Sequence, residues 1–409
     1  MTNLSQSIHP QLRRRVADGG KAADDPRDAA SRLREHGILS IVRLLSLSLE
    51  YFRSYERLDL TFGQSPMQLL VGENGSGKTN IVEAIGYLSQ GRSYLGVKPE
   101  DVIHWNKGHF RVRAETLSDA GAKSTLEVVF QQIPSRATAC FLSDVRVPFA
   151  TFIGSLPAIS FLPQDLGIFT GPPSQRRSFL DSLLVQLDPA YLPLRMRLER
   201  TLKQRNALLK RIDSGEAQES DLGTWDEELA SVGAGIQRAR LLLADSISKQ
   251  LPAMLSRLGE EWKTVEFTYI RSTAGLEEDA IRFEILSLLK DRRIKDIPAG
   301  TTTAGPHRDD WDVLIDGRSM GIVASRGQQR AGFVALLFIC VALLADRKNE
   351  KPLILLDDVL SELDEVHQEV LLKHCSDYQT IVTTAHLLEN LQSAGDIWEV
   401  EGGQVHRAS

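Results

Sequence analysis

The residues with the clearest chemical meaning lie between Gly72 and Thr79, in the sequence Gly-Glu-Asn-Gly-Ser-Gly-Lys-Thr. This run fits the pattern G-x-x-x-x-G-K-[ST], in which a glycine-rich loop surrounds phosphate groups with backbone N–H donors. A helix that starts near Lys78 would add the positive end of its dipole to the same place. We expect Lys78 to reach the outer phosphates of a nucleoside triphosphate and the Thr79 hydroxyl to hold Mg²⁺.

The elements on either side of this loop support the interpretation. Residues 67–71 are an apolar run that predicts a strand, and residues 81–88 carry apolar side chains at helical spacing. A glycine-rich turn that matched the pattern by chance would not need this strand and helix. The sequence therefore predicts a phosphate-binding loop between a strand and a helix.

Two consecutive carboxylates, Asp357 and Asp358, follow the apolar run 353–356. Ligands of open α/β sheets bind at the carboxyl ends of the strands, so we expect this strand and the run 381–386 to lie beside the phosphate loop. Asp357 is then placed to hold Mg²⁺ opposite Thr79. Asp358 is placed to orient or polarise the attacking water.

A second anion site is predicted where a long apolar run begins. Ser325 is a good N-cap residue, Gly327 permits close approach, and the uninterrupted apolar run 331–345 predicts a buried helix. A nucleotide held by one phosphate loop does not need a second such site from the same chain. We therefore expect a second copy to bring it, in a head-to-tail dimer that encloses the nucleotide.

Together these features resemble ABC-type ATPases of the SMC-like branch and, more narrowly, the RecF family of recombination mediators, over residues 38–400. The motifs that carry the resemblance are the phosphate loop, Gln164 at a strand end, Ser325-Arg326-Gly327-Gln328-Gln329, Leu355-Leu356-Asp357-Asp358, Ser361-Glu362-Leu363-Asp364, Phe52-Arg53-Ser54-Tyr55, Arg176-Arg177-Ser178-Phe179-Leu180-Asp181 and Gly305-Pro306-His307-Arg308-Asp309-Asp310. The resemblance implies a homodimer formed on ATP, with slow DNA-dependent ATP hydrolysis, that clamps double-stranded DNA near single-strand gaps or junctions. It also implies work with RecO and RecR in loading RecA during recombinational repair and replication.

The resemblance also implies roles for single residues. Gln164 is expected to contact Mg²⁺ and to take part in catalysis with Lys78 and Asp358. The nucleotide-binding set is expected to be Gly72, Glu73, Asn74, Gly75, Ser76, Gly77, Lys78, Thr79, Asn80 and Arg53. The signature supplied by the second copy is expected at Ser325, Arg326, Gly327, Gln328 and Gln329. The D-loop at the dimer contact is expected to include Ser361 and Asp364.

Two positions depart from the patterns of related ATPases. Many ABC ATPases have glutamate as the second carboxylate, and Asp358 is one methylene shorter, which fits slow hydrolysis. His386 stands where ABC transporters have a switch histidine, but a histidine there is not a regular feature of the RecF family. It is either a contact of the γ-phosphate or a plain strand-end residue.

The expected fold is α/β: an ABC-type ATPase head, with a mixed sheet, flanking helices and an antiparallel side sheet, and an inserted, mainly helical lobe. Two hairpins, at residues 41–62 and 110–133, predict the side sheet. The head is expected to comprise residues 38–177 and 298–409, and the lobe residues 178–297.

Three further expectations concern single stretches. Residues 1–37 carry many charges and few large apolar groups, so a disordered N-terminal extension is expected. Ser174 is expected to cap the helix that follows it. The alternating run 311–315 is expected to be a strand of the nucleotide-binding core.

Within the lobe, the amphipathic runs 194–212 and 229–247 predict an antiparallel helix pair. The first run carries Arg195, Arg197, Arg200, Lys203, Arg205, Lys210 and Arg211. These residues either contact DNA phosphates without reading sequence or form a solvated basic face partly balanced by Glu199. The candidates for DNA binding are Arg195, Arg197, Arg200 and Lys203.

Composition limits the function classes. A net charge of −6 over 409 residues excludes a generally basic nucleic-acid coat, so any DNA contact must be local. The three cysteines are far apart and form no C-x-x-C pair, which argues against a zinc site. The run 331–345 is shorter than the roughly 20 residues of a membrane span, and the sequence shows no signal segment. A cytoplasmic protein without membrane contact is expected.

Two other functions stay open as alternatives. The first is an SMC-like ATPase with another partner, in defence or chromosome maintenance. Long coiled coils would favour it, and neither helical run is long enough for one. The second is the ATPase subunit of a membrane transporter, which the helical insert and the motif at residues 305–310 fit poorly.

Overall fold

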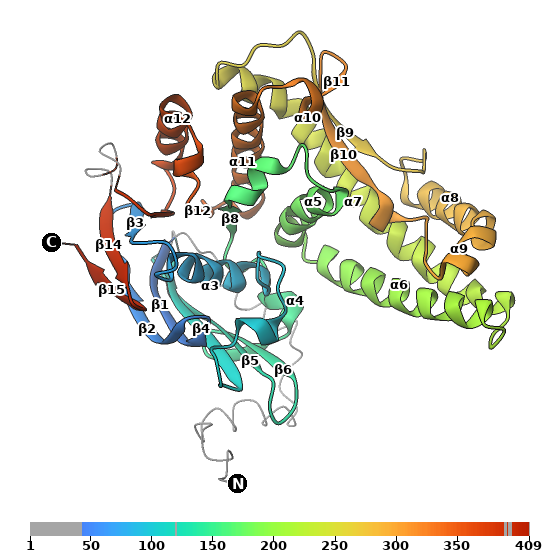
Figure 1. Ribbon diagram of the computed structural model, residues 1–409, viewed down its shortest axis with the longest axis horizontal. Helices are drawn as coiled ribbons and strands as arrows, with labels where there is room; N and C mark the ends of the chain where they lie inside the picture. The colour runs from blue at the N-terminus through green and yellow to red at the C-terminus, as the bar shows by residue number, and fades with distance from the viewer. Residues whose placement is uncertain (1–42, 119–120, 388–390, 392–394, 409) are drawn as a thin grey trace.

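A computed structural model describes residues 43–118, 121–387, 391 and 395–408, which form three β-sheets and the helices around them (Figure 1). The expected α/β class, with a mixed sheet, an antiparallel side sheet and a mainly helical part, is confirmed. The expected N-terminal extension, residues 1–37, lies outside the described residues.

The sheet that carries the phosphate loop has six strands, and its five neighbours from β14 to β8 are parallel. Their order is β15 (Gln404–Arg407), β14 (Asp396–Glu401), β3 (Met67–Val71), β13 (Thr380–Thr384), β12 (Leu353–Asp357) and β8 (Ala158–Phe161). The register pairs Val71 with Thr384 and Asp357 with Thr383. The phosphate loop and the Asp357 strand end therefore lie at the same edge, which confirms the predicted place of strands 353–357 and 380–384.

The side sheet is antiparallel throughout and unites the two predicted hairpins. Its order is β2 (Tyr55–Thr61), β1 (Arg43–Phe52), β4 (His109–Leu117), β5 (Lys123–Gln131), β6 (Ala137–Leu142) and β7 (Val145–Val147). Helix α3 (Lys78–Gln90) contacts strands of both sheets. Its apolar residues are buried nearly all round because it is covered on two sides. Phe52, Tyr87 and Phe110 pack edge to face between α3 and the side sheet.

The helices that follow β8 gather on the other side of the molecule (Figure 1). They are α5 (Pro173–Leu187), α6 (Tyr191–Asp213), α7 (Leu222–Arg257), α8 (Glu278–Asp291) and α9 (Arg293–Ala299). Helices α6 and α7 pack on each other and are joined by a turn in which Gly215 has φ +78°, so the predicted helix pair is confirmed. Short helices are α4 (Phe149–Phe152), α10 (Met320–Val323) and the 3-10 turns η2 (Pro99–Val102), η3 (Pro163–Gly167), η4 (Glu219–Asp221), η5 (Pro306–Arg308) and η6 (Leu360–Glu362).

Two local predictions are wrong. The run 311–315 does not join the phosphate-loop sheet: β10 (Asp310–Ile315) pairs with β9 (Val265–Ile270) and β11 (Arg318–Ser319) in a sheet of its own. Buried and partly exposed residues alternate along β10, because only one face of this strand is covered. In contrast, β12 in the phosphate-loop sheet is buried on both faces. Ser174 does not cap α5, because the helix already begins at Pro173, and proline supplies the fixed φ that favours the first helical position.

Helix α11 (Arg326–Lys348) contains the long apolar run. Among the described helices, it is the one with the length and hydropathy of a membrane span, and 67% of that apolar stretch is buried within the protein. It packs against α7, α5 and β8, as a core helix does. Helix α12 (Glu365–Cys375) contacts α11 and follows the D-loop.

Candidate functional site

The loop between β3 and α3 has the shape that its glycines predict. Gly77 precedes α3 with φ +112°, in the left-handed region that side chains disfavour. A Cβ at Gly77 would lie 2.7 Å from the Tyr55 hydroxyl, and one at Gly72 would lie 2.2 Å from the Val400 carbonyl oxygen. The Tyr55 hydroxyl donates to the Gly77 carbonyl at 3.2 Å, so the side sheet holds the loop in place.

Lys78 is folded back into this loop. Its ammonium group donates to the carbonyl oxygens of Gly72 at 2.5 Å and Glu73 at 2.7 Å. Burial lowers the pKa of Lys78, and the carboxylates of Asp358 and Asp357 oppose that shift. The Ser76 hydroxyl oxygen is buried and has no hydrogen-bond partner within the described part of the chain. A desolvated cation and an unpaired hydroxyl are what a loop that receives phosphate oxygens needs.

The two residues predicted to hold Mg²⁺ from opposite sides are in contact. The Thr79 hydroxyl donates to Asp357 Oδ1 at 3.0 Å, and the Thr383 hydroxyl donates to the same oxygen at 2.7 Å. Burial raises the pKa of Asp357, while these two hydrogen bonds lower it. Within the described residues no three His, Cys, Asp or Glu side chains cluster as metal ligands do. Thr79 and Asp357 supply adjacent oxygen ligands, which fit a Mg²⁺ ion that takes its other ligands from water and phosphate.

Asp358 is held in an unusual backbone conformation. Its φ is +53°, which is uncommon for a residue other than glycine. The Asp358 N–H donates to the Thr383 hydroxyl at 2.9 Å, and the Ser361 hydroxyl donates to the Asp358 carbonyl at 2.7 Å. These bonds fix a strained residue beside the phosphate loop, which is common at functional sites. Thr383, which contacts both aspartates, was missed by sequence reasoning, although it belongs to the polar end of a predicted strand.

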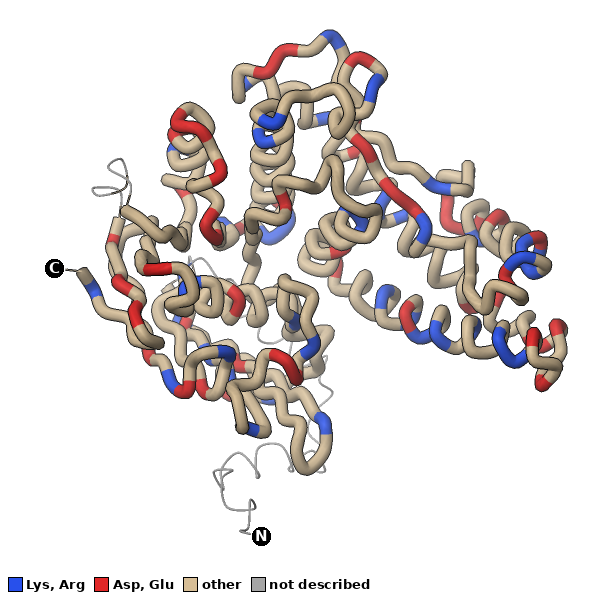
Figure 2. The backbone as a smooth tube through the Cα atoms, in the orientation of Figure 1, with Lys and Arg blue, Asp and Glu red and all other residues tan. Residues whose placement is uncertain are grey.

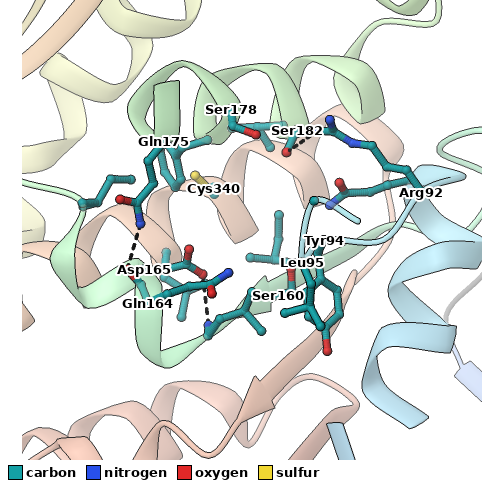
Figure 3. A pocket seen from close by; sticks show the side chains of 18 of the residues that line it. Arg92, Tyr94, Leu95, Ser160, Gln164, Asp165, Gln175, Ser178, Ser182 and Cys340 are labelled. Carbon is teal, nitrogen blue, oxygen red and sulfur yellow. Dashed lines mark hydrogen bonds between the residues drawn. The ribbon is translucent and has the colours of Figure 1, made fainter. Parts of the chain in front are cut away.

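Gln164 lies on the exposed turn η3, just after β8. Figure 3 shows it in the wall of a cavity of about 610 Å³ between η3, α5 and the segment after α3. Its carbonyl oxygen accepts a bond from Gln175 Nε2 at 2.8 Å. Next to it, burial raises the pKa of Asp165 to about 7. The predicted contact of Gln164 with Mg²⁺ stays a prediction.

Arg53 and Asn80 fasten the side sheet to the first turns of α3. The Arg53 guanidinium donates to both carboxylate oxygens of Glu83 at 2.7 Å, and Asn80 Nδ2 donates to the Ser54 hydroxyl at 2.8 Å. The Glu83 side chain is fully buried. Arg53 is thus held by an ion pair and is not directed freely at the loop. The only sequence signal for Glu83 is an acidic residue inside an otherwise apolar helix.

Ser325 caps α11, as predicted. Its hydroxyl accepts from the Gln328 N–H at 3.2 Å, and Gln328 Oε1 accepts from the Ser325 N–H at 3.0 Å. Gln329 Nε2 donates to the Ala324 carbonyl at 3.1 Å. Ser325 and Arg326 are exposed. In Figure 1 the start of α11, beside α10, lies far from the junction of β3 and α3. One chain does not bring the two predicted anion sites together.

The predicted D-loop is connected to the helix that carries the predicted signature in the same chain. Arg330 on α11 lies 3.5 Å from Glu362 on η6. Asp364 caps α12 by accepting from the His367 N–H at 3.0 Å, and this bond is the main cause of its lowered pKa. The Arg330–Glu362 pair therefore joins the first turn of α11 to the segment predicted to be the D-loop.

His386 follows β13, and its side chain is exposed. The Thr384 hydroxyl donates to the His386 carbonyl at 2.8 Å and shapes the chain at the end of the strand. Both interpretations of His386 stay predictions.

Basic residues are spread along α6 (Figure 2), and they differ in their partners. Arg197, Arg200 and Lys203 are all exposed. Arg197 pairs with Glu228 on α7 at 2.8 Å, and the partly buried Arg195 lies 3.5 Å from Glu199. The prediction that Arg205 belongs to the basic face is wrong. It is fully buried and pairs with Asp226 at 2.8 Å and Asp296 at 2.9 Å.

Comparisons with known proteins agree over most of the chain. A family model described as the RecF/RecN/SMC N terminal domain matches residues 43–403. The DNA replication and repair protein RecF of Heliobacterium modesticaldum is 32% identical over an alignment of 377 residues, and this alignment covers 90% of this chain and 100% of that protein. A solved structure of the recombination mediator protein RecF-ATPrS in the RecFOR pathway superposes with a TM-score of 0.83 at 27% identity, over 90% of this chain and 99% of that one. The corresponding RecF-ATP structure gives a TM-score of 0.82 at 27% identity, over 90% and 98%.

Proposed function

Because this chain belongs to the RecF family of DNA replication and repair proteins, within the SMC-like ABC ATPases, we propose that it binds ATP and Mg²⁺ between two copies of itself. Closure of this dimer clamps double-stranded DNA near single-strand gaps, and slow ATP hydrolysis reopens it. The proposed setting is recombinational repair, with RecO and RecR as the partners that help load RecA. The similar solved structures are of a RecF described as a recombination mediator protein in the RecFOR pathway, and this supports the proposed setting.

The observation that carries the proposal is the separation of two anion sites on one chain. The phosphate loop, with Thr79 in contact with Asp357, lies at one edge of the parallel sheet. The capped start of α11 lies elsewhere, with Ser325 exposed. A head-to-tail pair would place Ser325 of one copy over the nucleotide held by the other, and would do so twice because the pair is symmetric.

The residues at the loop divide the chemistry between them. Lys78 would leave the loop carbonyls and pair with the outer phosphates, while Ser76 would donate its unpaired hydroxyl. A Mg²⁺ ion held by Thr79 and Asp357 would neutralise phosphate charge. Asp358, whose backbone is fixed by bonds to Thr383 and Ser361, would accept a proton from the attacking water.

Nucleotide-driven dimerisation is tested by sedimentation velocity of the full chain with and without ATP and Mg²⁺. The expected result is a monomer without nucleotide and a dimer with it. Lys78→Met should abolish the shift, because it removes the cation that meets the phosphates. A dimer that forms equally without nucleotide, or with Lys78→Met, would contradict the proposal.

The DNA contact is tested by fluorescence anisotropy with gapped duplex, with ATP, over a salt series. Replacing both Arg200 and Lys203 with glutamine should reduce the slope of log affinity against log salt by about 1.8, since each phosphate contact contributes about 0.9. Arg197→Gln should change it less, because Glu228 already neutralises Arg197. Lys249→Gln on α7, which removes a cation paired with Asp245, is the control. If the double variant has an unchanged slope, DNA binds to a surface other than α6.

A further inference from the structure

Thr383 on β13 contacts both aspartates of the proposed nucleotide site. It lies opposite Asp357 in the parallel pairing of β13 with β12, and its side chain is fully buried. A threonine side chain is branched at Cβ, which restricts its rotation and holds the hydroxyl in one place. The directions of the hydrogen bonds at this hydroxyl show what it does to its neighbours.

The groups around Thr383 fix these directions. The Asp358 N–H can only donate, and it lies 2.9 Å from the Thr383 hydroxyl oxygen. The hydroxyl has one proton of its own, which it donates to Asp357 Oδ1 at 2.7 Å. The Asp358 N–H also reaches the Thr383 carbonyl, at the longer distance of 3.2 Å. A single hydroxyl therefore accepts from the main chain of one aspartate and donates to the side chain of the other.

The two carboxylate oxygens of Asp357 are unequal as a result. Oδ1 accepts a second bond, from the Thr79 hydroxyl at 3.0 Å. A carboxylate oxygen offers about two acceptor positions, so Oδ1 is filled. Oδ2 has no hydrogen-bond donor among the residues that the structure describes. Oδ2 is therefore the oxygen that is available to Mg²⁺ or to a water molecule bound to it.

Thr380, at the start of the same strand, shows how a buried threonine is satisfied away from the site. Its side chain is also fully buried, and its hydroxyl lies 3.2 Å from the Cys375 carbonyl and 3.3 Å from the Tyr378 carbonyl. A buried hydroxyl needs a partner, and a nearby main-chain carbonyl is a common one. Thr383 instead donates to a carboxylate that lies 26 residues away in the sequence. Local satisfaction of a buried hydroxyl does not explain this choice.

We propose that Thr383 is a positioning residue for ATP hydrolysis. Its hydroxyl keeps Oδ1 of Asp357 occupied, which leaves Oδ2 for the metal, and it holds the main chain of Asp358 beside the same carboxylate. The inference rests on the proposed function, because it needs ATP and Mg²⁺ at this site. Thr383 acts through the two aspartates and not by touching the nucleotide. Partners of this kind typically contribute about 10- to 100-fold to metal affinity or activity.

The first test measures the contribution of the metal to nucleotide binding. The dissociation constant of a fluorescent ATP analogue is determined in EDTA and in Mg²⁺, and the ratio of the two constants is the gain that the metal gives. Thr383→Val has nearly the same shape but no hydroxyl, so it should lower this ratio by about 10-fold or more. The affinity in EDTA should not change, because the phosphate loop is intact.

Two further variants show whether the hydroxyl itself is responsible. Thr383→Ser retains the hydroxyl and should keep most of the ratio. Thr380→Val is the matched control, since it removes a fully buried hydroxyl from the same strand, and it should leave the ratio unchanged. Thermal unfolding without nucleotide should show similar losses for Thr383→Val and Thr380→Val, because each loses one buried hydroxyl. If Thr383→Val does not fold, Thr383→Cys, which keeps only a weak donor, takes its place and should lower the ratio in the same direction.

The second test measures phosphate release at saturating ATP and Mg²⁺. Thr383→Val should lower kcat about 10- to 100-fold, and Thr383→Ser should restore most of it. In an Asp358→Asn background, Thr383→Val should still lower the ratio of dissociation constants by the same factor, because the metal effect passes through Asp357. If the effect on the ratio disappears in that background, the hydroxyl acts through Asp358 alone and the inference is overturned.

The remaining outcomes separate this inference from the proposed function. If the original chain gains no affinity from Mg²⁺ and releases no phosphate, the proposed function fails, and the role of Thr383 fails with it. If the original chain does both, and Thr383→Val matches Thr380→Val in the ratio and in kcat, the positioning role is overturned while the proposed function stands. If Thr383→Ser is impaired as much as Thr383→Val, the shape of the side chain and not its hydroxyl matters, and the inference is likewise overturned.

Discussion

Asp357 and Asp358 are adjacent in sequence, yet the backbone places them in different environments. Asp357 ends a strand buried on both faces and accepts bonds from two threonine hydroxyls. Asp358 turns into the left-handed region and is only partly buried. Two carboxylates can therefore serve two purposes, one as a metal ligand and the other as a base.

The role of Asp358 is tested by changing its charge and its length. Asp358→Asn should lower ATP turnover at least about 100-fold, the usual size of a general-base contribution, while ATP still drives dimerisation. Asp358→Glu should raise turnover, since the added methylene extends the carboxylate toward the attacking water. Phosphate release in the presence of DNA measures both. Unchanged turnover in Asp358→Asn would assign the base to another residue.

His307 gives the fold a dependence on pH. Burial lowers its pKa to about 4 from 6.5, although its Nε2 bonds the Thr302 carbonyl at 3.0 Å. The unfolded chain takes up a proton below pH 6.5 and the folded chain does not. The stability contributed by the neutral ring is thus complete above pH 6.5 and is lost as the pH falls toward 4.

Urea unfolding at pH 7.5 and pH 5 measures this effect. The original chain should lose about 2 kcal/mol more of its unfolding free energy than His307→Gln over this interval. His406→Gln, at an exposed histidine of β15, should behave like the original chain. Equal losses in the original chain and His307→Gln would show that His307 is not the titrating group.

At the level of elements, sequence reasoning succeeded where a pattern is local. The phosphate loop, the α6–α7 pair, the two hairpins and the Ser325 cap each follow from residues within one turn or one strand of each other. Sequence reasoning failed where the position of a residue or strand depends on contacts with residues far away in the sequence. Nothing near residue 205 indicates that Asp296 will lie beside it, and nothing near residue 311 indicates that β9 is the neighbour of β10. Pairing across long sequence separations is decided by the whole fold, not by a local pattern.

Arg205 makes this difference measurable. It is buried between Asp226 and Asp296 and also donates to the Thr302 hydroxyl at 2.9 Å, so it ties α6 to α7 and α9. Arg205→Met leaves Asp296 without its ion pair and should cost about 3–5 kcal/mol of unfolding free energy. Arg200→Met, at an exposed arginine of the same helix, should change it by no more than about 0.5 kcal/mol. If urea unfolding shows equally small changes in unfolding free energy for both variants, Arg205 is a solvated surface residue, as the sequence pattern predicted.

In the whole molecule, the fold separates the two halves of the proposed nucleotide site. The phosphate loop is held between the parallel sheet and the side sheet by Tyr55 and by the α3 contacts. The signature begins on α11, which packs with the helical part of the chain. The Arg330–Glu362 pair extends the signature side to the D-loop, so each copy presents two different surfaces. Such a molecule fits a dimer whose lifetime is set by the nucleotide.

Each nucleotide site is proposed to be shared by two copies, and mixing two inactive variants tests this sharing. Lys78→Met removes the phosphate-loop cation, and Ser325→Arg blocks the signature. A mixed dimer contains one site in which both halves are damaged and one site in which both are intact. Steady-state phosphate release should therefore recover to roughly a quarter of that of the original chain if the chains pair at random, and to roughly a half if only mixed dimers form. If the mixture releases no more phosphate than the two variants measured separately, the site lies within one chain and the account is contradicted.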